Sequence, residues 1–308
     1  TLNILSVVTP QFKSYELRDE EFESLTGITV NWTHIPFVAL QEKVSSVGVA
    51  ADGSFDVVNY LDSWGPPNAY WFVELDERLK EDGISMNRYP QAFAKSAMYK
   101  GKVMGFPLRA HPQLMFYRKD LFAKHDISVP TSWSEVASAG KVIKQKEGIG
   151  GLACYYGADG NRQNLFIWLN YLWAAGADVF DSDMKPAWTT PAGLKATRDY
   201  VELHTRHDIC GDGAVSNVEQ DARIQFSQGK AAMIPVWWWA YSGFSNPNQS
   251  KLDKSKVAFA GMPSYQGKTV TYAISMPFSI SKHSKNCLLY TSDAADEGLG
   301  VDLGGRRI

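Results

Sequence analysis

The sequence predicts an α/β protein in which a largely parallel sheet is flanked by helices. Apolar strand-like runs alternate with amphipathic helical patterns through the first hundred residues, and this alternation is typical of parallel sheets. With 308 residues and 44% apolar composition, the chain is long enough for two domains or for one large domain. Its longest apolar runs, such as residues 234–239, are far shorter than the roughly 20 residues of a membrane helix.

The first part of the chain predicts three strands and two helices in alternation. The first helical pattern ends at Gly27, which suits a C-cap because glycine adopts positive φ at low cost. Parallel strands bring their following loops to one edge, where open α/β sheets bind ligands, so residues 9–11 and 61–64 are candidate binding segments. The expected elements are strands at residues 2–8, 28–35 and 55–60 and helices at residues 12–25 and 37–49.

Helices and one long extended segment are predicted in the later part of the chain. Thr131 or Ser132 can cap the first of these helices with its side-chain oxygen. The expected elements are helices at residues 133–146, 164–175 and 191–204 and an extended segment at residues 231–239.

The charge balance argues against nucleic acid and anionic membrane surfaces as partners. Lys plus Arg number 31 and Asp plus Glu number 33, so no strong field of either sign is expected. Aromatic residues make up 13% of the chain, with 10 Trp, although no membrane span is predicted. Some of these rings are therefore expected to line a binding site.

The three cysteines do not decide the redox compartment. Cys154, Cys210 and Cys287 show neither CxxC spacing nor a disulfide framework. His204 and His207 precede Cys210 at a spacing compatible with a metal, but a helix C-terminus with basic residues explains the same pattern. We expect no metal and no cofactor.

Both ends of the sequence carry signs of processing. The chain opens at Thr1 without a Met and enters a strand at once, as a processed or truncated start would. Residues 287–308 resemble the in-frame translation of a sequencing-library adapter, with two constant arms separated by a short barcode. We therefore expect a non-native tail, with the natural sequence ending near Asn286.

An ordered series of short motifs covers residues 1–286 and resembles a known family. The series resembles the sugar-binding proteins of ABC importers, an extracellular solute-binding family that includes maltose- and polyol-binding proteins. The motifs are Glu-Phe-Glu at 21–23, Thr-Gly-Ile-Thr-Val at 26–30, Phe-Asp-Val-Val at 55–58, Gly-Lys-Val-Met-Gly-Phe-Pro at 101–107, Phe-Tyr-Arg-Lys-Asp-Leu-Phe at 116–122, Pro-Thr-Ser-Trp-Ser-Glu at 130–135, Gln-Gly-Lys-Ala-Ala-Met at 228–233 and Ile-Ser-Lys-His-Ser-Lys-Asn at 280–286.

The resemblance implies a two-lobed periplasmic-binding-protein fold of type II, each lobe a sheet flanked by helices, with the C-terminal part missing. Residues 1–110 plus 260–286 would form lobe 1, and residues 111–259 would form lobe 2. The chain would cross between lobes near residues 109–113 and again near 257–261, with the ligand in the cleft.

The resemblance also implies a function and a location. The protein would bind a sugar, oligosaccharide or sugar alcohol and deliver it to the permease subunits of an ABC transporter. It would act as a monomer without catalysing a reaction. Its location would be periplasmic, or extracellular as a membrane-anchored lipoprotein.

Carbohydrates offer C–H faces that pack on aromatic rings and hydroxyls that need polar partners, so both kinds of residue are candidates. If residues 236–239 are extended, Trp237 and Trp239 face one way as a stacking platform, and Trp238 faces the core. Asp62 and Trp64, which follow the third strand, form a second candidate group, in which an acid lies beside an aromatic ring. Either ring group could instead be core, and Asp62 could simply cap a helix.

The remaining candidates are polar residues from four segments of the chain and one methionine. Each has a plain structural alternative: an exposed loop amide, a hinge contact, a solvated helix start or core filling. Arg109 and His111 would point to the same side of an extended segment. His111 stands where relatives often carry an acidic residue, and residues 275–276 stand where many carry Gly and Trp. The candidates are Gln11, Arg109, His111, Arg162, Gln163, Asn164, Ser275 and Met276.

Two other functions are compatible with part of these features. A glycoside hydrolase would need two carboxyl groups that face one bond, and no motif supplies the second. A sensory module that presents a carbohydrate to a receptor would share the fold, and neighbouring genes would distinguish it from an importer component.

Overall fold

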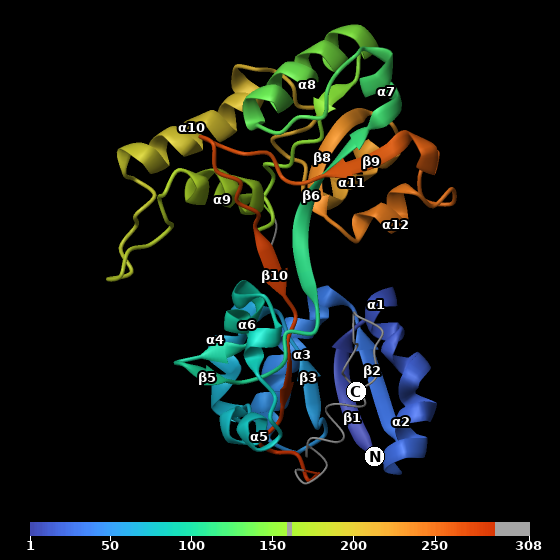
Figure 1. Cartoon of the computed structure of the whole chain (residues 1–308), viewed down its shortest axis with the longest axis vertical. Helices are drawn as coiled ribbons and strands as arrows, with labels where there is room; N and C mark the ends of the chain where they lie inside the picture. The colour runs from blue at the N-terminus through green and yellow to red at the C-terminus, as the bar shows by residue number, and fades with distance from the viewer. Residues whose placement is uncertain (159–161, 287–308) are drawn as a thin grey trace. The chain divides into compact units, whose positions relative to one another are not determined.

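The computed structural model describes residues 1–158 and 162–286, and the expectation of a non-native tail at 287–308 lies outside these residues. The chain forms two compact units. Unit 1 contains Thr1–Ala110 and the described residues from Ile274 onward, whereas unit 2 contains His111–Ala273 (Figure 1).

Unit 1 is built on a four-stranded sheet in the order β11, β3, β1, β2. β1 pairs in parallel with both β2 and β3, which lie on either side of it (Figure 1). β11 adds an antiparallel edge to β3. The parallel sheet predicted from the first hundred residues is therefore confirmed. The strands are β1 (Leu2–Val7), β2 (Val30–Ile35), β3 (Val57–Asn59) and β11 (Phe278–Ile280).

The first predicted helix is divided into three short pieces, whereas the second is continuous. The last piece, α2, ends at Gly27 in the left-handed conformation, and the N–H of this glycine donates to the carbonyl of Glu23. The C-cap predicted at Gly27 is thereby confirmed. The pieces are α1 (Pro10–Lys13), the 3-10 turn η1 (Tyr15–Arg18) and α2 (Asp19–Thr26), and the continuous helix is α3 (Phe37–Ala50).

Short elements complete unit 1 around a core of aromatic and branched side chains. Leu5, Val58 and Phe72 are fully buried in this core. The short elements are η2 (Asp62–Trp64), α4 (Gly65–Asn68), η3 (Ala69–Trp71), α5 (Asp76–Glu81), η4 (Met86–Arg88), α6 (Gln91–Ser96), β4 (Met98–Tyr99) and β5 (Lys102–Val103).

The sheet of unit 2 is centred on β6, which is antiparallel to β8 and to β9. β7 pairs in parallel with β8, and β10 neighbours β6. The strands are β6 (Ala110–Arg118), β7 (Gly150–Leu152), β8 (Ala231–Trp237), β9 (Val257–Ala260) and β10 (Ala273–Ser275).

The chain returns to unit 1 later than the sequence suggested. Residues 257–261 were expected to cross between lobes, but β9 pairs with β6 inside unit 2. The division falls after Ala273, so residues 260–273 belong to unit 2 rather than to the first lobe. Hydrogen bonding along β6 keeps this segment in the second unit, and a motif alone does not reveal that pairing.

The helices of unit 2 begin and end close to the predicted positions. Ser132 caps α8 through a capping box, in which its hydroxyl accepts from the N–H of Glu135 and the Glu135 carboxylate accepts from the Ser132 N–H. The helices are α7 (Lys119–Lys124), α8 (Trp133–Glu147), α9 (Leu165–Ala174), α10 (Pro191–Thr205), α11 (Glu219–Ser227) and α12 (Ala240–Phe244), with a 3-10 turn η5 (Lys254–Lys256).

The extended segment predicted at residues 231–239 is too long. β8 ends at Trp237, and Trp238 and Trp239 lie in the turn before α12. The alternation of faces therefore does not extend to Trp239. Trp238, which was expected to face the core, is 38% exposed.

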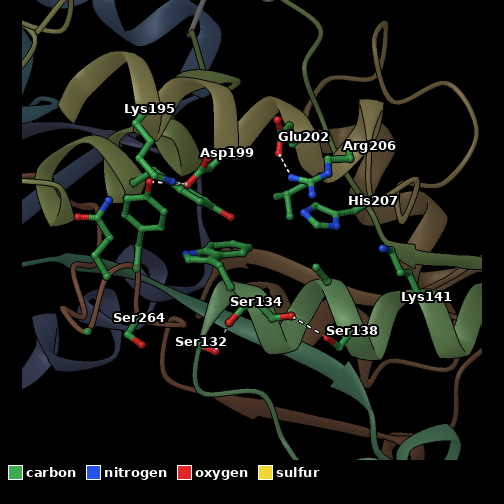
Figure 2. Close-up of a pocket in the computed structure, with 17 residues that line it drawn as sticks. Ser132, Ser134, Ser138, Lys141, Lys195, Asp199, Glu202, Arg206, His207 and Ser264 are labelled. Atoms are coloured by element: carbon green, nitrogen blue, oxygen red, sulfur yellow. Dashed lines mark hydrogen bonds and ion pairs between the residues drawn. The ribbon is translucent and has the colours of Figure 1, made fainter. Parts of the chain in front are cut away.

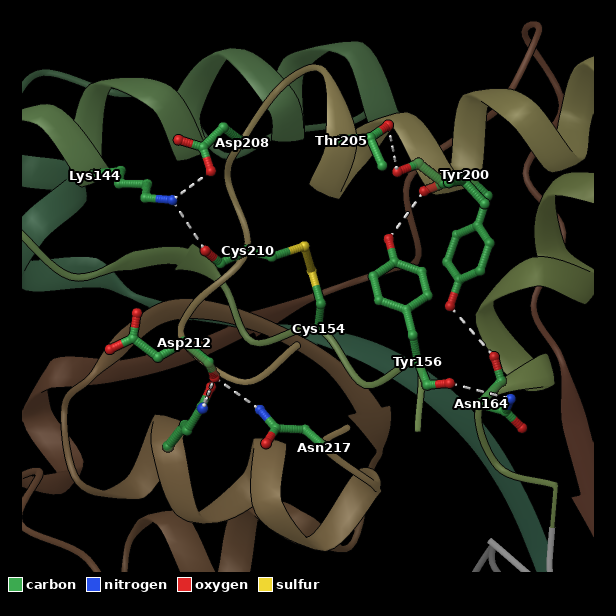
Figure 3. Close-up of a disulfide and its surroundings, with 12 residues drawn as sticks. Lys144, Cys154, Tyr156, Asn164, Tyr200, Thr205, Asp208, Cys210, Asp212 and Asn217 are labelled. Atoms are coloured by element: carbon green, nitrogen blue, oxygen red, sulfur yellow. Dashed lines mark hydrogen bonds and ion pairs between the residues drawn. A yellow bond between two sulfur atoms is a disulfide. The ribbon is translucent and has the colours of Figure 1, made fainter. Parts of the chain in front are cut away.

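Unit 2 contains a disulfide that the cysteine spacing did not predict. Cys154 follows β7, Cys210 follows α10, and the two sulfurs are bonded across a sequence separation of 56 residues (Figure 3). The backbones of Leu152 and Cys210 already pair as a short parallel bridge, so the fold brings the cysteines together.

Two features are absent from the residues that the structure describes. Over residues 1–158 and 162–286, no helix combines the length and apolar character needed to cross a bilayer. Within the same ranges, no group of three or more His, Cys, Asp or Glu side chains could hold a metal ion.

Candidate functional site

In unit 1, Asp62 lies directly after β3 at the carboxyl edge of the parallel strands. Its Oδ2 accepts the N–H of Ser275 at 2.9 Å, and its Oδ1 accepts the N–H of Ser63 at 2.7 Å. Burial raises the pKa of the Asp62 carboxyl, while these two backbone hydrogen bonds act against the increase. Asp62 is thus a partly desolvated carboxylate that can still accept hydrogen bonds from a hydroxyl.

Arg109 lies at the same edge, beside the loop that follows β1. Its Nη1 donates to Thr9 Oγ1 at 3.2 Å, and its guanidinium lies 5.1 Å from the centre of the Phe12 ring. Burial lowers the pKa of Arg109 to about 10, so the group remains charged at neutral pH. The Nε atom is buried and has no hydrogen-bond acceptor within the described residues, which leaves one donor available.

Four predicted residues of unit 1 come together, and two do not join them. Arg109 contacts the sulfur of Met276 at 3.9 Å, and Ser275, the neighbour of Met276, is bonded to Asp62. Trp64 is 8% exposed and packs its ring 5.3 Å from Phe37 in the core. Gln11 is half-buried in α1. The structure therefore does not pair Asp62 and Trp64 as one acid and ring unit.

A cavity of about 310 Å³ lies beside Asp62 in unit 1. Asp62 and Lys95 supply charged groups to its wall, and Tyr60 and Tyr99 supply rings. The full lining consists of Tyr60, Asp62, Ser63, Gly65, Pro66, Lys95, Ser96, Ala97, Met98, Tyr99 and Met104.

In unit 2, five aromatic rings gather at the end where the chain enters at β6 and leaves at β10. We call Phe166, Trp173, Trp237, Trp239 and Tyr272 the aromatic group. Phe166 stacks on Tyr272 at 4.5 Å and meets Trp237 edge-on at 5.4 Å. Tyr272 also stacks with Trp173, and the centres of these two rings are 5.8 Å apart. Trp237 is 3% exposed, whereas the other four rings are half-buried and keep accessible surface.

His111 links the two predicted tryptophans of this group. Trp239 Nε1 donates to His111 Nδ1 at 3.0 Å, and the His111 ring lies edge-on to Trp237 at 6.2 Å. An indole N–H can only donate, so His111 Nδ1 carries no proton in this arrangement. His111 is 4% exposed, and its contacts with both indole rings place it in support of them.

Glu219 belongs to this site although no sequence motif pointed to it. The residue is 1% exposed, and its Oε2 accepts Trp237 Nε1–H at 2.7 Å. Its Oε1 lies 3.0 Å from Arg223 Nε, and the Arg223 guanidinium lies 5.2 Å from the centre of the Trp239 ring. An acid in the first turn of a helix ordinarily faces solvent, so its sequence position indicated nothing.

Asn170 is a second residue that sequence reasoning missed. Its Nδ2 donates to Gln113 Oε1 at 3.0 Å, and its Oδ1 accepts the N–H of Tyr272 at 2.5 Å. Because Asn170 is 2% exposed, these bonds fix the segment that carries Tyr272 against β6.

The three residues predicted before α9 differ in how far they are buried in unit 2. Arg162 is exposed and has a positive φ of 56°, and Gln163 is half-buried. Asn164 Nδ2 lies 3.4 Å from the carbonyl oxygen of Tyr156, and the Asn164 carbonyl accepts the hydroxyl of Tyr200 at 3.3 Å (Figure 3). These bonds anchor the start of α9 beside the disulfide.

A larger pocket of about 640 Å³ lies elsewhere in unit 2 and contains no predicted site residue. Figure 2 shows residues of α8 on one side and residues of α10 on the other. Its acids are paired within the wall, because Lys195 meets Asp199 at 2.5 Å and Arg206 meets Glu202 at 3.0 Å.

The architecture defines the class of the protein. Two α/β units, each with a helix-flanked sheet and joined through β6 and β10, form a periplasmic-binding-protein fold of type II. The fold class predicted from the sequence is confirmed. The family of bacterial extracellular solute-binding proteins matches residues 8–297, and the chain belongs to this family.

Individual relatives are similar at low identity. A binding protein of Brucella abortus is 26% identical over 270 residues, covering 84% of this chain and 62% of that protein. The mannitol-binding protein of Pseudomonas aeruginosa is 25% identical, covering 77% and 55% respectively. Maltose-bound MalE3 of T. maritima superposes with a TM-score of 0.78 at 23% identity, covering 96% and 75%. The chain thus spans less than two thirds of the length of the Brucella and Pseudomonas proteins.

Proposed function

We propose that this protein binds a small carbohydrate, a sugar, an oligosaccharide or a sugar alcohol, and delivers it to an ABC import permease. The observation that carries the proposal is the aromatic group, in which partly accessible rings lie beside buried hydrogen-bonding side chains. Rings of this kind pack against sugar C–H faces, and polar partners select among hydroxyl arrangements. The mannitol-binding and maltose-bound relatives support the choice of ligand class.

Each unit presents its own kind of candidate contact. In unit 2, Trp239 would stack on the ligand, with Phe166 and Tyr272 extending the apolar surface and Trp237 supporting them from beneath. In unit 1, Asp62 would accept and Arg109 would donate hydrogen bonds to hydroxyls. A ring that buries a sugar face removes on the order of 100 Å² of apolar surface, roughly 2 to 3 kcal/mol before ordering costs.

Titration calorimetry of the whole chain tests this proposal. D-mannitol, ribitol and maltose would be titrated separately, with L-leucine and L-glutamate as non-carbohydrate comparisons. We expect one or more carbohydrates to bind and neither amino acid to do so. Binding of an amino acid, with no carbohydrate bound, would overturn the proposed ligand class.

We propose that the bound carbohydrate leaves unchanged. The proposal rests on the contacts of two acids. Both oxygens of Asp62 already accept backbone N–H groups, and the Glu219 carboxylate is hydrogen-bonded to Trp237 and ion-paired with Arg223. Incubation with maltose and longer maltodextrins, followed by a reducing-end assay, checks this, and protein-dependent release of reducing ends would contradict it.

The protein would act outside the cytoplasm, in the periplasm or at the cell surface as a lipoprotein. The buried Cys154–Cys210 disulfide supports this location, because such bonds persist in oxidising compartments. A sensory role for the same fold would be recognised from a histidine-kinase gene, rather than permease genes, beside this one. Fractionation of cells that express the complete gene tests the location.

A further inference from the structure

We propose that Glu219 is a positioning residue that sets the orientation of Trp237 and Trp239 for ligand stacking. This inference rests on the proposed function of the aromatic group. Glu219 would not touch the ligand itself but would determine how the rings of Trp237 and Trp239 are oriented toward it.

The carboxylate of Glu219 is almost completely buried. At 1% exposure, an unpartnered carboxylate would be strongly unfavourable, so its partners must compensate for lost hydration. One partner is Trp237 Nε1–H at 2.7 Å, a bond that fixes the rotation of the indole about its own axis. Trp237 is therefore held by a directed bond as well as by its ring contacts.

The same carboxylate is connected to Trp239 through Arg223. Arg223 lies one helical turn after Glu219 on α11, at an ion-pair distance of 3.0 Å. This contact is an ion pair and not a hydrogen bond, since Arg223 Nε has no hydrogen-bond partner in the described part of the chain. Charge attraction to Glu219 therefore holds Arg223 more than a directed bond does. The guanidinium then covers one face of the Trp239 ring at 5.2 Å.

Two neighbours determine which part of the Trp239 ring stays accessible. His111 accepts the indole N–H at 3.0 Å and fixes one edge, while Arg223 occupies one face. Trp239 is half-buried, so its remaining accessible surface is available for stacking. Glu219, through Arg223, would thus determine which face of Trp239 a carbohydrate meets.

The variant Glu219→Gln tests this role because it keeps volume and an acceptor for Trp237 but removes the charge that holds Arg223. Glu202→Gln is a matched control, since Glu202 and Arg206 form another i, i+4 pair at 3.0 Å on α10, away from the aromatic group. Titration with D-mannitol or maltose should show affinity lowered about tenfold by Glu219→Gln and by less than about twofold by Glu202→Gln.

A double-variant cycle separates positioning from general destabilisation. If Glu219 acts through Trp239, Glu219→Gln should weaken binding little further in a Trp239→Ala background. An equal loss of affinity in both backgrounds would overturn the inference. Arg223→Gln should reproduce the effect of Glu219→Gln, and it provides the test if Glu219→Gln does not fold.

Ligand-free spectroscopy keeps this test independent of the proposed function. Glu219→Gln should increase acrylamide quenching of tryptophan fluorescence and change the near-ultraviolet circular dichroism, whereas Glu202→Gln should change neither. If no carbohydrate binds but these signals change, the proposed function fails and the positioning role stands. Unchanged spectra in the folded Glu219→Gln variant would contradict the positioning role.

Discussion

Three consecutive tryptophans occupy three different environments in this protein. Trp237 ends β8 and is 3% exposed, Trp238 is 38% exposed, and Trp239 lies between these values while its N–H bonds to His111. The residue type predicted a cluster of rings, but the point at which the strand ends determined how each ring faces. Buried Trp237 and half-buried Trp239 are consequently expected to respond differently to substitution.

Replacement of Trp239 by Ala should lower carbohydrate affinity by about 2 kcal/mol, or about 30-fold, because a stacking ring is lost. Its effect on unfolding should be smaller than that of Trp237→Ala, for which removal of a buried aromatic side chain predicts a loss of about 3 to 5 kcal/mol. Calorimetric titration and denaturant unfolding measure the two quantities. If Trp239→Ala lost stability but kept its affinity, the ring would belong to the core rather than to the site.

Asp62 should make the stability of the protein depend on pH in a defined direction. Burial raises the pKa of this carboxyl above its ordinary value of 3.8, so the folded state binds the proton more tightly than the unfolded state. As pH rises from the ordinary value through the raised folded pKa, the folded protein should therefore lose stability relative to Asp62→Asn. Denaturant titrations of both proteins between about pH 3 and pH 7 measure the difference. A gain in the stability of the wild type relative to Asp62→Asn as pH rises would show that hydrogen bonding outweighs burial.

Local patterns located the strands β1, β2, β3 and β8 and the longer helices α3, α8, α9 and α10. The capping box at Ser132 and the left-handed Gly27 were recognisable because both depend on residues adjacent in sequence. The end of β8, the pairing of β9 with β6 and the disulfide were not recognisable. Each depends on a partner strand or on a residue distant along the chain.

Removal of the disulfide should destabilise unit 2. The Cys154–Cys210 bond closes a loop across 56 residues, and loop-closure entropy predicts a loss of about 4 kcal/mol for Cys154→Ala with Cys210→Ala. Urea unfolding of the double variant and of the wild type compares the two. Cys287→Ser is the control and should unfold like the wild type. No difference between the double variant and the control would show that the bond does not form in the protein.

At the scale of the whole molecule, the chain passes between its units at Ala110–His111 and again at Ala273–Ile274. Two residues proposed to bind ligand lie close in sequence to these passages, Arg109 in unit 1 and Tyr272 in unit 2. A carbohydrate that binds only the folded chain would stabilise it against unfolding.

Saturating carbohydrate should accordingly raise the thermal unfolding midpoint. At a ligand concentration of about 100 times Kd, binding to the folded state alone adds roughly 2.7 kcal/mol of stability. Differential scanning fluorimetry with D-mannitol, ribitol and maltose measures the shift, which should be much smaller in Trp239→Ala. A shift of equal size in this variant at the same concentrations would show that the ligand binds elsewhere.

The sequence by itself determined the α/β class, the order of the elements and the family, because strand and helix periodicity and short motifs are local properties. It also identified Asp62, Arg109, His111 and Trp239 as candidates, since their residue types carry the relevant chemistry. Only the tertiary structure revealed the Cys154–Cys210 bond and the later return of the chain to unit 1. It also revealed the buried Glu219, whose role depends on Trp237, 18 residues away in sequence. Such contacts are formed when distant segments pack, and no neighbouring residue encodes them.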